Sequence, residues 1–237
     1  MEMVRFLSTI SGVEEIMPII KSSELKHEWK IRASKDISKC PVGQVMRNVS
    51  RCPGINALHK TGWIVRLWQD VTITADEEGD DISWTAPVDD TSIAPIISFH
   101  DKDVFHKYRS DWPKNTSKHI LKFNTGWRAI IPKGYKLLQL PVMMSDETNF
   151  TPVEGVYDIG DQAGLAIPVY WHNVGTKVLK AGTPLAQLIL IPDEEYEFTV
   201  EGDTSETEKE FNIQNMLYSN TLFRNYNKIR KFWRNRK

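Results

Sequence analysis

Histidine and aspartate side chains are concentrated in one short stretch of the chain, S-F-H-D-K-D-V-F-H-K-Y. Two histidines and one carboxylate can hold a non-haem iron ion as a facial triad. That site usually needs His-x-Asp and a second histidine on a later strand. Here His100 is followed by Asp101, Asp103 and His106, and His172 is the candidate for the distant ligand. A metal-dependent oxygenase is therefore one hypothesis, but we prefer a polar surface loop, which predicts no bound metal and no cofactor.

A second set of polar residues lies in the turn P-V-E-G-V-Y-D, which contains Glu154, Gly155 and Asp158. A carboxylate at such a turn could act as a general base or hold a ligand hydroxyl group. The chain contains no G-x-S-x-G, H-E-x-x-H or G-x-x-x-x-G-K-[ST] motif, so the common hydrolase, zinc-protease and phosphate-loop sites are not predicted. Such acids are more often simple turn residues, and if they have a function we expect ligand binding and not catalysis.

The end of the chain combines basic and aromatic side chains. From Arg224 onward there are seven Lys or Arg residues and no acid, and residues 211–237 are predicted to form an amphipathic helix. Such a helix suits nucleic-acid phosphates, an anionic membrane surface or an acidic protein. Alternatively, it packs on the rest of the protein or on a neighbouring subunit. The predicted partner-binding residues are Arg224, Lys228, Arg230, Lys231, Trp233 and Arg234.

The elements that must position these residues are predicted to be mainly strands. Between residues 120 and 192, short apolar runs alternate with Pro-Lys-Gly, Glu-Gly and Ala-Gly-Thr-Pro turns, which is typical of a compact antiparallel β-domain. We predict a β-rich domain over residues 1–195, an acidic linker over 196–210 and the basic helix over 211–237.

Earlier in the chain, residues 61–73 form a strong strand pattern that is rich in β-branched and aromatic side chains. An acidic turn at 76–81 and a returning strand at 82–84 are predicted to follow it, then a short strand at 96–99 and a helical turn near 104–108. Residues 26–33 alternate Trp29 and Ile31 with basic residues, which predicts a half-buried strand.

The composition limits the class of protein. The 237 residues carry a formal charge of -1 and are 41% apolar, as expected for a protein with a substantial core. Cys40 and Cys52 form no metal-binding pair, and we expect both to be reduced thiols. The sequence shows no export signal and no apolar stretch long enough to cross a membrane, so we expect a cytoplasmic protein without a transmembrane segment.

Residues 123–192 resemble the dUTPase and dCTP-deaminase superfamily, which has the β-clip fold. The similarity lies in N-T-G-W-R-A-I-I-P-K-G-Y, in G-V-Y-D and in A-G-T-P-L-A-Q-L-I-L. The resemblance implies that Asp158 occupies the water-binding position and that Gln187 is the nucleotide-contacting glutamine. It also implies a β-clip-like or β-sandwich domain that forms homo-oligomers.

Departures from that superfamily argue against dUTPase catalysis. Residues 140–144 read L-P-V-M-M where the Arg-Ser-Ser phosphate motif would fall, and no Gly-rich arginine arm ends the chain. A longer similarity, over residues 18–192, links the chain to an uncharacterised family of bacterial and phage proteins. It implies a bacterial or phage-infected host cell as the setting.

We therefore predict a non-enzymatic binding or assembly protein whose basic helix docks on protein or nucleic acid. The first alternative is a small-molecule, nucleotide-binding protein with a degenerate pocket at Glu154, Gly155, Asp158 and Gln187. The oxygenase is the second.

Overall fold

The computed structural model describes residues 3–38, 52–88, 95–108, 112, 114–158, 163–197, 200 and 209. The chain divides into two compact units. The first contains Met1–Ser34 and Val49–Glu194, and the second contains Lys35–Asn48 and Glu195–Lys237. The predicted acidic linker and basic helix lie almost entirely outside the described residues. The first unit holds the strands and both apolar cores.

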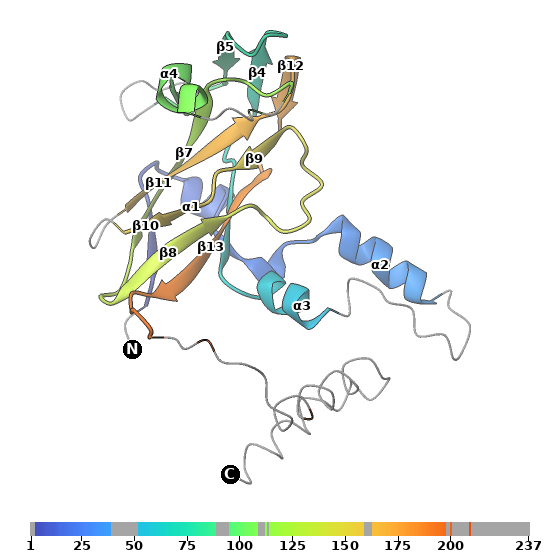
Figure 1. Cartoon of the computed structure of the whole chain (residues 1–237), viewed down its shortest axis with the longest axis vertical. Coiled ribbons are helices and arrows are strands. Elements are labelled where there is room, and N and C mark those ends of the chain that lie inside the picture. Colours follow the sequence, from blue (N-terminus) through green and yellow to red (C-terminus); the bar gives the residue numbers. More distant parts are fainter. Residues whose placement is uncertain are drawn as a thin grey trace. The chain divides into compact units, whose positions relative to one another are not determined.

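One five-stranded sheet in the first unit is built around two long strands, β7 and β11, which pair with each other and run side by side in Figure 1. Its strand order is β1-β7-β11-β9, and β6 pairs with the same edge of β7 as β1 does. The strands are β1 (Arg5–Ser8), β6 (Ile97–His100), β7 (Ile120–Ile130), β9 (Phe150–Pro152) and β11 (Ala163–Trp171). We call this sheet A.

A second five-stranded sheet, sheet B, has the order β10-β8-β13-β3-β2. Its strands are β2 (Ile20–Lys21), β3 (Trp63–Arg66), β8 (Tyr135–Leu140), β10 (Gly155–Tyr157) and β13 (Pro184–Pro192). β3 follows Gly62, whose backbone has a φ of +76° and packs so closely on β13 that a Cβ atom would lie 1.9 Å from the Leu188 carbonyl oxygen. Only glycine satisfies both conditions.

A third sheet, sheet C, contains β12 (Gly175–Leu179), β4 (Val71–Ala75) and β5 (Ile82–Thr85) in that order. The hairpin predicted around the acidic turn is confirmed, because β4 pairs with β5 across it. The single strand predicted over residues 61–73 is instead two strands in different sheets. The chain leaves sheet B after β3 and enters sheet C at β4, and Leu67 and Trp68 lie in the connection.

Short helices connect the strands. They are α1 (Val13–Ile16), η1 (Ser22–Glu24), α2 (Glu28–Ser38), α3 (Pro53–His59), α4 (Lys102–Phe105) and η3 (His106–Tyr108). The helical turn predicted near residues 104–108 is confirmed. The strand predicted over residues 26–33 is wrong, because α2 covers most of that segment. Trp29 and Ala33 are buried one helical turn apart, while Ile31 is 49% exposed, so the buried face has the period of a helix.

Two apolar clusters form the core, and sheet A contributes to both. One joins sheet A to sheet C through residues such as Phe123, Trp171 and Ile73. The other joins sheet A to sheet B through Trp127, Leu137 and Leu188. Every strand pair is antiparallel, so the predicted mainly antiparallel β class is confirmed. Among the described helices, none is long and apolar enough to cross a membrane.

Candidate functional site

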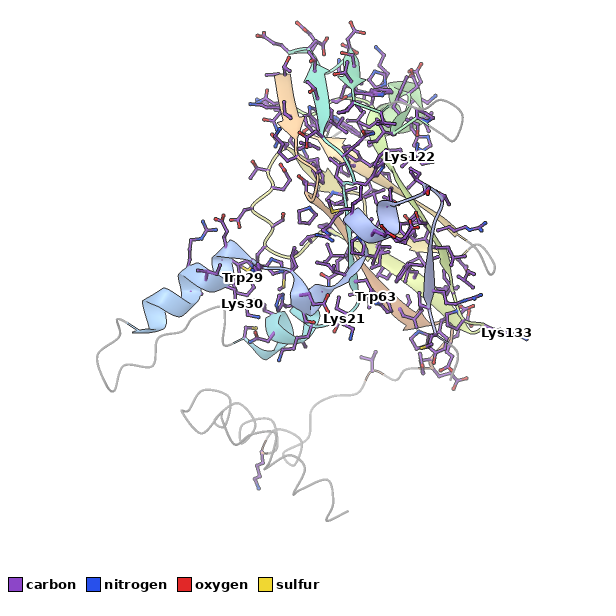
Figure 2. All side chains as sticks on the ribbon, turned by 180° about the vertical axis from the view of Figure 1, so that it is seen from behind. Lys21, Trp29, Lys30, Trp63, Lys122 and Lys133 are labelled. Carbon is purple, nitrogen blue, oxygen red and sulfur yellow. The ribbon has the colours of Figure 1, made fainter. Side chains whose placement is uncertain are left out.

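The turn predicted to bind a ligand borders a cavity of about 250 Å³ between β10 and the strands of sheet A. Glu154 and Gly155, two of the four predicted ligand-binding residues, line it. We call it the β10 cavity. Lys122, which Figure 2 labels, belongs to the wall on β7. The lining residues are His100, Lys122, Gln139, Val153, Glu154, Gly155, Val156, Tyr157, Ala166 and Pro168.

Two polar side chains of this cavity, Tyr157 and Gln139, are held in place by hydrogen bonds. The Tyr157 hydroxyl group lies 2.7 Å from Oε1 of Gln139 and 3.0 Å from the carbonyl oxygen of Ala166. Nε2 of Gln139 donates to the Val153 carbonyl oxygen at 2.6 Å. Burial raises the pKa of the Tyr157 hydroxyl group well above its ordinary value, so the phenol stays protonated at neutral pH. The cavity wall therefore needs little rearrangement before it can bind a ligand.

Asp158, the third predicted residue, is not among the residues that line the cavity. Its Oδ2 lies 3.1 Å from Nζ of Lys136, and the same ammonium group lies 2.7 Å from Oδ1 of Asp193. These two partners, Asp193 first, raise the pKa of Lys136. The Asp158 side chain is 63% exposed. A carboxylate that is paired with an ammonium group and open to water is a poor general base.

Gln187, the fourth predicted residue, is 1% exposed on β13. Its Nε2 donates to the carbonyl oxygens of Leu58 at 2.8 Å and Thr61 at 2.7 Å. The amide thereby fixes the end of α3 and the turn that leads into β3. Its contact with a ligand stays a prediction, since the structure gives its nitrogen two protein partners and places it outside the β10 cavity lining.

The residues proposed for an iron site do not come together. Nδ1 of His172 lies 3.0 Å from Oγ1 of Thr116, and Nε2 lies 2.7 Å from Oγ1 of Thr151. Asp101 instead caps α4, because its Oδ1 accepts a hydrogen bond from the backbone N of Asp103 at 3.0 Å. Within the described residues no group of three or more His, Cys, Asp or Glu side chains could hold a metal ion. Nothing in that part of the chain supports the oxygenase hypothesis.

The acidic hairpin tip has a structural contact of its own. Asp80 lies 2.7 Å from Nζ of Lys102 and 2.6 Å from Nζ of Lys118. Hydrogen bonds from these two lysines lower the pKa of Asp80 to about 2. The carboxylate therefore attaches the tip to α4 and to the chain that leads into β7.

Sequence reasoning missed Lys122 and Gln139, and it assigned His100 to an iron site. All three line the β10 cavity from other strands. They could not have been found from the local turn motif, because strand pairing brings them there. The six predicted partner-binding residues, from Arg224 to Arg234, lie outside the described residues.

No protein-family model matches the chain, and no curated protein matches it. The predicted membership of an uncharacterised bacterial and phage family therefore stays a prediction. Among solved structures, the dUTPase of Staphylococcus bacteriophage 80alpha with dUPNHPP is 10% identical, with a TM-score of 0.37 over 86% of this chain and 91% of that chain. A variant dUTPase from phage phi11 of S. aureus is also 10% identical, with a TM-score of 0.36 over 86% of this chain and 99% of that chain. We transfer no residue role from either.

Proposed function

We propose that this chain is a non-enzymatic binding protein and that the β10 cavity holds part of a nucleotide or a similar small polar molecule. One observation carries the proposal. Glu154 and Gly155, singled out from the sequence, border a cavity in which two further polar side chains, Tyr157 and Gln139, are already fixed by hydrogen bonds. A volume of about 250 Å³ suits one ring system better than an entire drug-sized ligand.

We propose that the chain is not a catalyst because of where the two acidic residues of the turn, Glu154 and Asp158, lie relative to the cavity. General acid–base chemistry needs a carboxylate or histidine within reach of the reacting group and with a suitable pKa. Asp158 pairs with Lys136 and does not line the cavity. Glu154 alone provides a carboxylate at the cavity wall, where it can accept a hydrogen bond from a ligand hydroxyl or amino group.

A thermal-shift screen of the full chain against ribonucleotides and deoxynucleotides tests this site. A ligand that binds only the folded state raises the melting temperature by mass action. The key variant is Gly155→Val, because a Cβ atom at Gly155 meets no atom within 4 Å and valine is compatible with a strand. We expect Gly155→Val to remove the shift while the protein stays folded.

Asp158→Ala is the matched comparison, because it removes a carboxylate that lies outside the cavity lining. We expect it to keep the ligand-induced shift. Loss of the shift in Asp158→Ala alone would move the site to Asp158 and Lys136. No shift with any nucleotide in the parent protein would refute the small-molecule function.

A second candidate function is assembly on a partner through residues 211–237. The sequence favours it, because seven basic residues and no acid follow position 223 and aromatic residues lie between them. The partner would be an acidic protein surface, a nucleic acid or another subunit. This function needs no catalytic group and is compatible with the small-molecule site.

A further inference from the structure

Two cavities adjoin the loop that connects β8 to β9, residues 141–149 (Figure 1). The first, which we call the polar cavity, has a volume of about 290 Å³ and walls that include Lys26, His27, Ser145, Asp146, Glu147 and Thr183. The second, the apolar cavity, has a volume of about 250 Å³ and walls that include Pro141, Met144, Phe150, Pro152 and Leu185. Four residues of the two linings are the same, Glu147 among them, so the cavities meet at this loop.

The loop between the cavities is held in place by its own hydrogen bonds. The backbone N of Ser145 donates to the Val142 carbonyl oxygen at 3.2 Å, and Oγ of Ser145 accepts from the backbone N of Glu147 at 3.1 Å. Oε1 of Glu147 in turn accepts from the backbone N and from Nδ2 of Asn149, both at 2.6 Å. The walls that the loop contributes are therefore in place before a ligand arrives, which lowers the cost of binding.

The same loop contains a strained residue. Residues 142–145 form a β-turn, and Met144, its third residue, has a φ of +51°. Glycine or asparagine normally occupies a turn position with positive φ. Strain of this kind is concentrated at binding and catalytic sites. Met144 is 44% exposed and borders the apolar cavity, so the strained turn places an apolar side chain at its wall.

Two opposite charges in the polar cavity have no partner within the described part of the chain. Asp146 is neutralised by an ion pair with Arg32. No ion pair among the described residues involves Lys26 or Glu147, so these two do not pair with each other either. The cavity wall thus offers one ammonium group and one carboxylate, which favours a ligand that has one charge of each sign.

His27 adds a hydrogen-bonding group beside Lys26. Its side chain is only 7% exposed, and neither ring nitrogen has a hydrogen-bond partner among the described residues. Neither nitrogen is fully enclosed, in contrast to Nδ1 of His59 and Nε1 of Trp29 behind it. A ring nitrogen of His27 can therefore reach a ligand in the polar cavity. Together with the Lys26 ammonium group it suits a carboxylate.

The apolar cavity is enclosed by buried side chains. Val142, Phe150 and Leu185 are 6%, 5% and 0% exposed. Glu147 is the one charged residue in its lining, and Glu147 also borders the polar cavity. A ligand that spans both cavities would therefore place a cationic group at the junction and an apolar group beyond it.

We propose that the two cavities together bind a free α-amino acid with an aliphatic side chain. The ligand carboxylate would accept from Nζ of Lys26 and from a ring nitrogen of His27, and the ligand ammonium group would donate to Glu147. The side chain would enter the apolar cavity beside Phe150 and Met144. A free amino acid fits better than a peptide terminus, because a terminal residue has only one of the two charges. The proposal does not depend on the function of the β10 cavity.

Saturation-transfer NMR and calorimetry with the full chain at neutral pH test the proposal. The probe is L-leucine. Three analogues each lack one feature: 4-methylpentanoic acid lacks the ammonium group, 3-methylbutylamine lacks the carboxylate, and L-alanine lacks most of the side chain. We expect L-leucine to bind and each analogue to bind at least tenfold more weakly, because a charge-assisted hydrogen bond or several buried methyl and methylene groups contribute a factor of that size.

Two charge-removing variants assign the ligand groups to protein groups. Glu147→Gln keeps a side-chain oxygen for Asn149, and we expect it to weaken L-leucine and 3-methylbutylamine but to leave 4-methylpentanoic acid unchanged. Lys26→Met should do the reverse, weakening L-leucine and the acid but not the amine. Glu154→Gln, which alters the β10 cavity, is the matched control and should leave L-leucine binding unchanged.

Met144→Gly separates strain from binding. Glycine adopts positive φ without strain, so we expect a higher melting temperature together with weaker L-leucine binding. Unchanged L-leucine binding in this variant would count against the apolar cavity as the side-chain site. No L-leucine binding to the parent protein, or equal weakening of the acid and the amine by Glu147→Gln and Lys26→Met, would overturn the proposal. If Glu147→Gln does not fold, Lys26→Met with the two analogues still decides the outcome.

Discussion

Single side chains in this protein connect segments that are far apart in the sequence, and Gln187 is the clearest case. Its Nε2 donates to two carbonyl oxygens, those of Leu58 and Thr61, from a position that is 1% exposed. We predict that Gln187→Leu lowers the free energy of unfolding by about 1–3 kcal/mol, because a buried amide loses its hydrogen bonds to both carbonyl groups. The Leu58 carbonyl oxygen still accepts from the backbone N of Thr61 at 3.0 Å. Urea denaturation measures the change in the free energy of unfolding directly.

A comparison residue shows whether the effect depends on burial. Thr74 and Thr176 share a hydrogen bond of 3.0 Å between exposed hydroxyl groups. Thr74→Val should change stability by less than about 0.5 kcal/mol, because water replaces the lost bond. If Gln187→Leu were equally mild but removed ligand binding, the ligand-contact role predicted for Gln187 would gain support over the structural one.

The candidate site could be predicted from the sequence only where its residues are local. Glu154 and Gly155 belong to a turn motif of a few consecutive residues, and the residue types alone are enough to identify such a turn. Lys122 and Gln139 reach the same cavity through the pairing of β7 and β8 with other strands. A single sequence does not reveal which strands pair, so these residues could not be predicted.

At the scale of elements, strand positions after residue 120 followed from alternation and turn residues, whereas α2 did not. A few alternating residues, Trp29 to Arg32, fit a strand and a helix about equally well. Trp29 and Ala33 are one helical turn apart, and this spacing places both side chains on the buried face of α2. Trp29 packs against His27 and His59, with ring centroids 5.9 and 6.3 Å away.

This contact makes the attachment of α2 sensitive to pH. His27 and His59 have ring centroids 4.7 Å apart, and both have a lowered pKa, mainly because burial disfavours the charged form and secondly because Lys30 is nearby. Lys60 also lowers the pKa of His59, while Asp146 opposes the shift of His27.

The direction of the pH effect follows from these lowered values. The unfolded chain takes up these protons near pH 6.5, before the folded chain does, so the stabilisation is complete above that pH and is lost as the pH falls below it. We predict that amide hydrogen exchange over residues 28–34, corrected for intrinsic rates, accelerates between pH 7 and pH 5.

Phenylalanine keeps the ring packing and cannot be protonated, so a His27→Phe and His59→Phe double variant should keep α2 protected at the lower pH. Lys30→Met should raise both pKa values and shrink the change. Equal acceleration in the double variant would show that other groups control α2.

At the scale of the whole molecule, the first unit is stabilised by contacts among its own residues. Sheet A forms one apolar cluster with sheet C and a second with sheet B, and the residues of both clusters lie between positions 6 and 190. Asp80 adds a further connection between the hairpin tip and the chain before β7.

Deletion of residues 211–237 should therefore leave the β-domain folded and should remove partner binding or self-association. We predict a melting temperature within about 2 °C of that of the full chain, since no described core contact is lost. Thermal denaturation followed by circular dichroism measures the fold, and light scattering after gel filtration measures the oligomeric state.

Separate variants identify which property of the segment matters. Exchange of Arg224, Lys228, Arg230, Lys231 and Arg234 for glutamine removes charge and keeps the aromatic residues, whereas Trp233→Ala does the reverse. If charge drives docking, the glutamine variant should lose binding, and added salt should weaken binding of the parent chain through screening. If the deletion instead lowers the melting temperature by many degrees, the segment is a packing element of the folded protein. The assembly function would then lose its basis, because the same residues would be stabilising this chain rather than contacting a partner.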